Sequence, residues 1–278
     1  MRSDVAAIAA VVLWGSLASL AVALDSIPPL LMTGIGLVIG SIISLPVSKF
    51  QIKALLPTKK VMLVGVYGLL GYHAALFAGL QNAPSVQANL VNYLWPVLVV
   101  VLAPLFIKTS KLTASHIVAA VIGFSGASLA ILSGAELVSG FAFGYVYAGI
   151  AALVFSSYSL MTKRLEKSPT AAVGGYCFVA GVLAILMHFI FEQPTLIDGN
   201  QWVWLLALGL GPLGASFYLW DYALKNGPAQ RVGTIAFFTP VISTALLLLT
   251  TGQQLSINLA AAAVLILVAA VFGSRVNN

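Results

Sequence analysis

The sequence predicts an all-α integral membrane protein of ten transmembrane helices, and three observations lead to this prediction. Only 7% of the 278 residues are charged and the mean hydropathy is +1.05, whereas a soluble domain carries about 25% charged residues. The apolar residues form ten blocks of about 20 residues, each long enough to cross a hydrocarbon core of roughly 30 Å as a helix. The ten-residue alternating segments typical of an outer-membrane barrel are absent.

The first block, Asp4–Leu24, begins like a secretory signal peptide, because Arg2 precedes it and Ala21-Val22-Ala23 fits an A-x-A cleavage site. The block is long for a signal peptide, and Asp4 is unusual at the start of one. In addition, Ile8-Ala9-Ala10 recurs later as Ile150-Ala151-Ala152. We therefore expect a retained first helix.

Nine further blocks follow, separated by short charged or Gly/Pro-rich connections that leave no room for a soluble domain. In order, they are Pro29–Val47, Lys60–Leu80, Val86–Ile107, Thr113–Ser133, Phe141–Thr162, Thr170–Phe191, Gln201–Leu224, Val232–Thr250 and Ser256–Ser274. The single cysteine, Cys177, lies inside one block and is expected to be a small packing residue.

The loop charges predict the orientation of these helices. With the N-terminus in the cytoplasm, every Lys and Arg falls on the cytoplasmic side, and the opposite side receives Asp25, Glu136, Glu192 and Asp198. The positive-inside rule concerns short loops of this kind. Both termini are therefore expected in the cytoplasm, with the chain in a bacterial-type inner membrane. The net charge of +6 comes from loop residues, so nucleic acid is not an expected partner.

The two halves of the chain echo each other. Asn82-Ala83-Pro84 and Tyr93–Val97 recur as Asn226-Gly227-Pro228 and Phe237–Val241, at a constant offset of 144 residues. We expect one repeat at 1–137 and a second at 138–278. Each holds five blocks, so the copies face opposite ways across the membrane. Inverted repeats are a common build for secondary transporters, with the substrate near the midplane.

The segments that carry this echo resemble a known family. Asn82–Phe106 and Asn226–Ser243 are similar to the EamA-type modules of the drug/metabolite transporter superfamily. Within it, Asn92–Pro96 together with Gly71-Tyr72-His73 resembles the YddG group of aromatic amino-acid exporters. The resemblance implies ten helices in a five-plus-five inverted repeat. It also implies export of small metabolites, with aromatic or other apolar amino acids the expected cargo.

The fourth block supplies the first candidate binding residues. Asn89 and Asn92 share one helical face, and an asparagine in lipid costs desolvation unless it has a partner. Pro96 cannot donate a backbone hydrogen bond and therefore leaves a carbonyl near Asn92 without its usual partner. A polar, kinkable face beside Tyr93 and Trp95 suits a binding site. The alternative is that the asparagines join neighbouring helices.

Two ionisable residues lie inside apolar blocks. His73 occupies the middle of the third block, and with Tyr72 we expect it to contact substrate or to take part in proton coupling. A hydrogen bond to a neighbouring helix is the alternative. Asp221 either pairs with Lys225 one helical turn away or has a coupling role.

Aromatic and flexible positions complete the candidate site. Rings around a cavity suit an aromatic ligand, although rings in membrane helices also face lipid or form interfacial belts. The remaining candidates for substrate contact are Trp14, Ser157, Tyr158, Tyr218 and Phe237, and those for hinge or gating roles are Pro96, Pro240, Gly211 and Pro212.

Enzyme signatures are absent: no G-x-S-x-G, H-E-x-x-H, Walker A loop or C-x-x-C occurs, and Gly209–Gly214 fits G-x-G-x-x-G only inside a membrane block. We expect a monomeric secondary transporter that works by alternating access, without cofactor or metal, with a small amino acid and the lipid bilayer as its partners. The alternatives are a permease of the same fold for a drug, a carboxylate or a sugar derivative, a channel, or a membrane-embedded enzyme.

Overall fold

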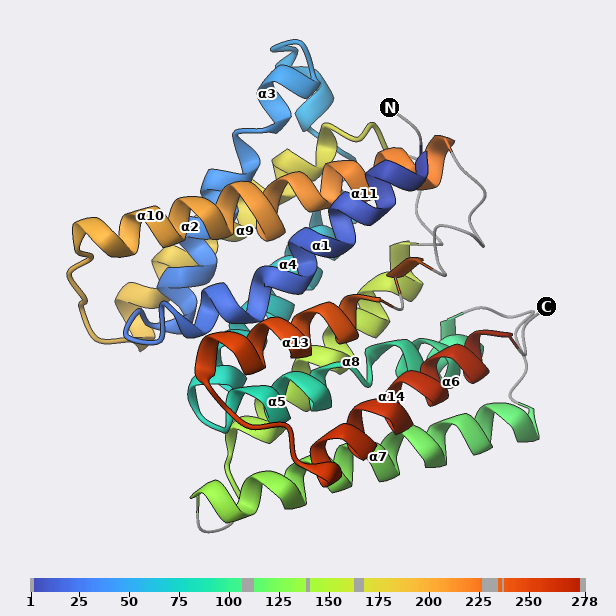
Figure 1. The fold of residues 1–278 in the computed structure, drawn as a ribbon. Coiled ribbons are helices and arrows are strands. Elements are labelled where there is room, and N and C mark those ends of the chain that lie inside the picture. The colour runs from blue at the N-terminus through green and yellow to red at the C-terminus, as the bar shows by residue number, and fades with distance from the viewer. Residues whose placement is uncertain are drawn as a thin grey trace.

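The computed structural model describes residues 3–106, 113–138, 141–162, 168–226, 235–236 and 238–275. Within these ranges the regular secondary structure is helical and no strand occurs (Figure 1). Six helical segments there are long and apolar enough to cross a membrane, and shorter apolar helices accompany them. The all-helical membrane fold is thus confirmed, whereas the count of ten spans stays a prediction.

The first half of the chain forms six α-helices and one short 3-10 helix. They are α1 (Ser3–Val22), α2 (Pro29–Ser41), α3 (Ser44–Val47), η1 (Ile52–Leu55), α4 (Lys59–Gln81), α5 (Ser85–Asn92) and α6 (Trp95–Phe106). The long helix α7 (Ala114–Val138) follows.

The second half forms a similar series. It contains α8 (Gly144–Thr162), α9 (Ala172–Phe191), α10 (Gly199–Leu210), the π-helix η2 (Gly211–Ala215), α11 (Ser216–Asn226), α13 (Thr239–Thr251) and α14 (Ile257–Arg275).

The fourth predicted span is broken into α5 and α6 at Tyr93-Leu94. Pro96 is the second residue of α6, where a missing backbone N–H is tolerated because the first turn of a helix has no partner for it. In the second half, α13 begins at Thr239 with Pro240 in its first turn. Trp95 and Thr239 are separated by 144 residues, so both helices start at equivalent points of the sequence echo.

The helices of the two halves are interleaved. Helix α2 packs against α9, and α7 packs against α14, so these elements pair with their counterparts in the other half. Two further contacts have counterparts in the other half. Helix α4 packs on α8 as α11 packs on α1, and α1 packs on α13 as α8 packs on α6 (Figure 1). Each half therefore inserts its first helix among the third and fourth spans of the other.

Glycine allows the close approach of α2 to α9. A Cβ atom at Gly34 would lie 2.9 Å from the Gly181 carbonyl oxygen, and one at Gly181 would lie 2.8 Å from the Gly34 oxygen. Membrane helices gain association energy from such van der Waals contact, because lipid supplies no hydrophobic drive between helices. A side chain larger than hydrogen at either position would push the two backbones apart.

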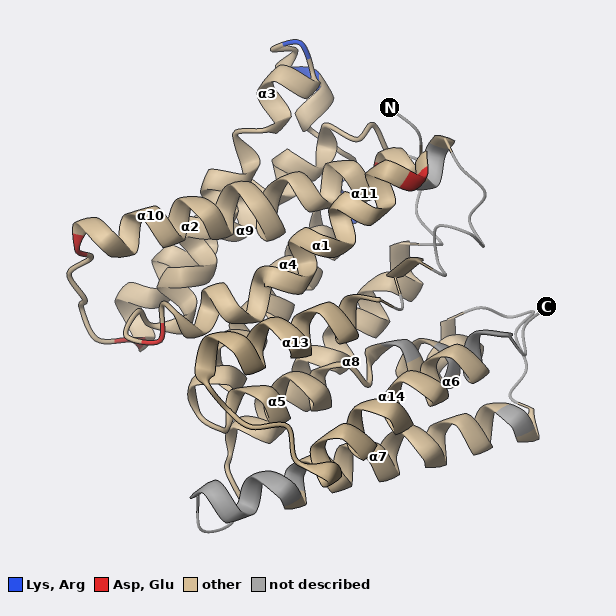
Figure 2. Ribbon diagram, viewed as in Figure 1, with Lys and Arg blue, Asp and Glu red and all other residues tan. Residues whose placement is uncertain are grey.

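Lysines gather at one end of the described structure and acidic residues at the other, although an acidic position also lies beside α11, away from that second end (Figure 2). Four lysines, Lys49, Lys53, Lys59 and Lys60, lie in and around the connection from α3 to α4. At the far end, Asp198 caps α10, whose Gln201 bonds Ser26 between α1 and α2. We call these the basic end and the acidic end. The basic residues from Lys108 to Lys111, from Lys163 to Lys167 and at Arg231 lie outside the described residues.

Glu192 joins α2 to α9 at the acidic end. Its carboxylate accepts backbone hydrogen bonds from Leu30 (2.8 Å) and Leu31 (3.2 Å) in the first turn of α2. The buried His188 lies one turn earlier on α9, and its Nδ1 is 2.9 Å from the same carboxylate. Negative charge at a helix N-terminus is favourable because the unpaired N–H groups there carry partial positive charge.

The glycine contact generates a stability prediction. Gly181→Ala should lower the melting temperature of the detergent-solubilised protein by several degrees, since overpacking costs about 1–3 kcal/mol. Gly149→Ala is the matched control, because a Cβ there meets nothing within 4 Å. Thermal unfolding of both variants beside the wild type checks this, and equal melting temperatures for the two variants would contradict the close contact.

Candidate functional site

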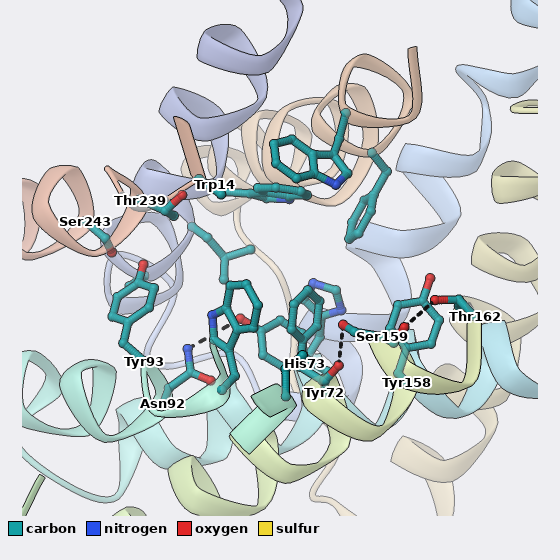
Figure 3. Close-up of a pocket in the computed structure, with 18 of the residues that line it drawn as sticks. Trp14, Tyr72, His73, Asn92, Tyr93, Tyr158, Ser159, Thr162, Thr239 and Ser243 are labelled. Carbon is teal, nitrogen blue, oxygen red and sulfur yellow. Dashed lines mark hydrogen bonds between the residues drawn. The ribbon is translucent and has the colours of Figure 1, made fainter. Parts of the chain in front are cut away.

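A cavity of about 520 Å³ lies between the two halves, with walls from α1, α4, α5, α6, α8, α9, α11 and α13. Binding pockets for small molecules span about 300–1,000 Å³, so the space suits a metabolite. Figure 3 shows aromatic and polar side chains converging on it from several helices.

Aromatic rings form one wall of the cavity. The Phe155 ring of α8 lies between Tyr72 and Trp95, with centroid distances of 4.8 Å and 4.9 Å. Tyr158, one turn further along α8, lies 6.1 Å from Phe155. Tilted and edge contacts of this kind are favourable for aromatic pairs. They also fix the ring planes, which gives the wall a definite shape before any ligand enters.

A second group of rings comes from α1 and α11. Trp14 meets Phe217 edge-on at 5.7 Å and Trp220 at 5.1 Å. Phe217 also approaches the His73 ring of α4, at 6.2 Å. Rings from both halves of the chain therefore surround the same space, and aromatic side chains supply much of the lining.

Two asparagines of α5 bring amide groups to the cavity. Asn89 Nδ2 donates to Ser243 Oγ on α13 over 2.9 Å, which links α5 to α13 across the two halves. Asn92 Nδ2 donates a longer bond of 3.4 Å to the Tyr72 hydroxyl (Figure 3). Asn89 thus serves as the interhelical link that the sequence offered as an alternative, while also lining the cavity.

The sequence echo continues inside the cavity. At the offset of 144 residues, Asn92 corresponds to Ala236 and Trp95 to Thr239, and all four line the cavity. His73 corresponds in the same way to Phe217. In each pair one side chain is more polar than the other. The lining residues therefore come from equivalent positions of the two halves but differ in side-chain chemistry.

The cavity occupies the half of the molecule nearer the basic end. Beyond His73, α4 continues with Leu76, Phe77 and Leu80, which are buried and take no part in the lining. The opposite limit is polar: Thr162 at the end of α8, and Asp221 near the end of α11. A packed apolar layer thus separates the cavity from the acidic end.

Asp221 is the charged residue of the lining within the described ranges, and its carboxylate accepts a hydrogen bond from the Thr170 hydroxyl. The side chain of Lys225, its expected partner, lies outside the described residues. The Ser159 hydroxyl donates to the backbone oxygen of Phe155, and the Thr162 hydroxyl donates to the backbone oxygen of Ser159 (Figure 3).

The structure brings most of the expected contact residues together. The cavity lining includes Trp14, Tyr72, His73, Asn89, Asn92, Tyr93, Trp95, Tyr158 and Asp221. Phe237 and the side chain of Pro96 lie outside the described residues. Pro240 is in the first turn of α13, and Gly211 and Pro212 open η2, a π-helix between α10 and α11 that also packs on α1 and α2.

Ser157 and Tyr218 lie elsewhere. The Ser157 hydroxyl is 2.8 Å from the Tyr67 hydroxyl, outside the cavity. Ser157 is adjacent to Tyr158 in the sequence, and adjacent side chains on a helix point in directions about 100° apart. Tyr218 is likewise next to Phe217, and its hydroxyl points toward Gly174 of α9, where a Cβ would lie 2.9 Å away.

Several lining residues were not among the sequence candidates. They are Phe155, Ser159, Thr162, Tyr176, Phe217, Thr239 and Ser243, together with small and aliphatic side chains. The sequence held a signal for some of them. Phe155 precedes Tyr158 by three residues, and Phe217 and Thr239 are the echoes of His73 and Trp95.

Known proteins resemble this chain over most of its length. It is 34% identical over 247 residues to a protein from Ancylobacter novellus named aromatic amino acid exporter YddG. The aligned region covers 86% of this chain and 85% of that protein. The uncharacterized transporter YoaV of Bacillus subtilis is 26% identical, with 93% and 92% covered. A solved crystal structure matches this chain with a TM-score of 0.75 and a sequence identity of 32%. The match covers 99% of this chain and 96% of the chain in that structure.

The family itself is recognised in both halves. Residues 1–132 and residues 142–275 each match the EamA-like transporter family. The resemblance drawn from Asn82–Phe106 and Asn226–Ser243 is thereby confirmed. The chain is a multi-pass membrane protein that belongs to the EamA-like transporter family of the drug/metabolite transporter superfamily.

Proposed function

We propose that this transporter exports aromatic or other apolar amino acids across the inner membrane. The observation that carries the proposal is the ring-lined cavity between the halves, in which Trp14, Tyr72 and Trp95 surround a few hydrogen-bonding groups. An aromatic amino acid has an apolar ring and two polar groups at its other end. The name of the relative from Ancylobacter novellus supports the same cargo class.

The lining disfavours anionic cargo. Among the lining residues that the structure describes, none is Lys or Arg, and the charged one is Asp221. A carboxylate metabolite with no compensating ammonium would meet unfavourable charge in a space of low dielectric. A zwitterion or a neutral amphiphile avoids this cost, which favours amino acids over simple organic acids.

Alternating access is the mechanism that we propose for the two repeats. The break before Trp95 and the start of α13 at Thr239 lie at the cavity, where irregular backbone is tolerated in a membrane protein. Segments on either side of a break can tilt separately, with Pro96 and Pro240 beside the pivots. Opening of the apolar layer around Phe77 would then give access from the acidic end while the basic end closes.

We infer ten membrane spans with both termini in the cytoplasm and the repeats at 1–137 and 138–278. The family matches at 1–132 and 142–275 support two units. The basic end, with Lys49 and Lys53, then faces the cytoplasm by the positive-inside rule. In this orientation the cavity faces the cytoplasm, from which an exporter must load. Since both repeats lie in one chain, a monomer suffices.

Transport into liposomes tests the cargo. Purified protein in liposomes should take up labelled tryptophan and phenylalanine with saturation, competed by other aromatic amino acids. Trp95→Ala should raise KM by about tenfold or more, because the ring contacts it supplies are lost. Trp204→Ala is the matched control, since Trp204 lies on α10 with 45% of its surface exposed. Folded protein that shows no uptake above empty liposomes would refute the amino-acid cargo.

Cysteine labelling tests the orientation. With the buried Cys177 replaced by alanine, Lys53→Cys should react with a membrane-impermeant maleimide only after spheroplasts are lysed. Leu196→Cys, at a position 96% exposed between α9 and α10, should react in intact spheroplasts. The reverse pattern would place the basic end outside, and labelling of both sites from one side would exclude the proposed span count.

A further inference from the structure

The tautomer of His73 is set by its own helix. Its Nδ1 lies 2.8 Å from the Leu69 carbonyl oxygen. A carbonyl oxygen only accepts hydrogen bonds, so Nδ1 must carry the hydrogen. The ring lies among aromatic side chains and is 1% exposed, surroundings in which an unpaired charge is costly. The neutral ring therefore presents Nε2 as an acceptor, with a lone pair and no proton.

This Nε2 atom is available to a ligand. His73 lines the cavity, and its hydrogen bond is made by Nδ1. Among the described residues, His73 Nε2 is not one of the fully buried side-chain atoms that lack a hydrogen-bond partner. Nε2 is therefore an acceptor with no donor among the described residues, and it belongs to a buried side chain that lines the cavity (His73 in Figure 3).

The surroundings of His73 suit the ring of a ligand better than its charged groups. Tyr72 meets the imidazole at a centroid distance of 4.8 Å and Phe217 at 6.2 Å. The equivalent position in the second half is Phe217 itself, so His73 presents a ring nitrogen where the other half presents a phenyl ring. The polar limit of the cavity, near Thr162 and Asp221, lies toward the basic end.

We propose that the cavity prefers aromatic amino acids whose ring carries a hydrogen-bond donor, with the indole N–H of tryptophan donating to His73 Nε2. This inference rests on the proposed amino-acid transport. A phenyl ring in the same place fills the space and leaves Nε2 without either water or a donor. Such a buried, unsatisfied acceptor costs free energy, and this cost is the source of discrimination.

Two ligands that differ at one atom test the preference. In 3-benzothienylalanine, sulfur replaces the indole N–H of tryptophan, so the shape is kept and the donor is lost. Inhibition of labelled tryptophan uptake into proteoliposomes gives the relative affinity of each unlabelled compound. Unlabelled tryptophan should inhibit at a concentration about tenfold lower than 3-benzothienylalanine or phenylalanine.

The variant His73→Phe assigns the preference to His73. Phenylalanine already occupies the equivalent position, Phe217, so a ring of this size is compatible with the local helix packing. Whatever rate of labelled phenylalanine uptake this variant shows, the ratio of its inhibition by tryptophan and by 3-benzothienylalanine should fall from about ten to about one. Only tryptophan should lose affinity.

The outcomes separate the two claims. Equal inhibition by tryptophan and 3-benzothienylalanine in the wild type would overturn the preference and leave amino-acid transport standing, and this comparison needs no variant. A preference that survives in His73→Phe would overturn the role of His73. Absence of any saturable uptake of either labelled amino acid by folded wild-type protein would overturn the proposed function, and the preference with it.

Discussion

The need to satisfy every backbone hydrogen bond inside a bilayer constrains the whole architecture, because no water is present there to replace a lost partner. Helices meet this need within themselves, and departures from α-helix are tolerated only where protein or a cavity surrounds them. The break at Tyr93-Leu94 and the start of α13 at Thr239 both lie beside the cavity. The site is thus found where the membrane permits irregular backbone.

Much of the fold could be predicted, because block length and loop charge reflect the bilayer directly. The proline-containing echo marked the places where α6 and α13 begin. The face of each helix was harder to assign. In a membrane helix almost every face is apolar, so the periodicity that distinguishes inside from outside in a soluble helix is lost. Ser157 and Tyr158 illustrate this, since adjacent residues point in different directions.

Equivalent positions in the two halves carry different chemistry in the cavity. The pairs His73 and Phe217, and Asn92 and Ala236, occupy equivalent places in the echo, yet in each pair one side chain is polar and the other is apolar. A symmetric ligand would gain little from such a lining. An amino acid, polar at one end and aromatic at the other, matches an asymmetric lining on a symmetric scaffold, and residue types read singly do not show this pairing.

Helices α2 and α9 have a mechanical consequence for the transport cycle. They touch through Gly34 and Gly181, and the Glu192 carboxylate binds the first turn of α2 at the acidic end. Separating them there would break both hydrogen bonds to the first turn of α2. In the alternating access proposed above, this pair would stay together while the other helices move around it, so the two halves would not part.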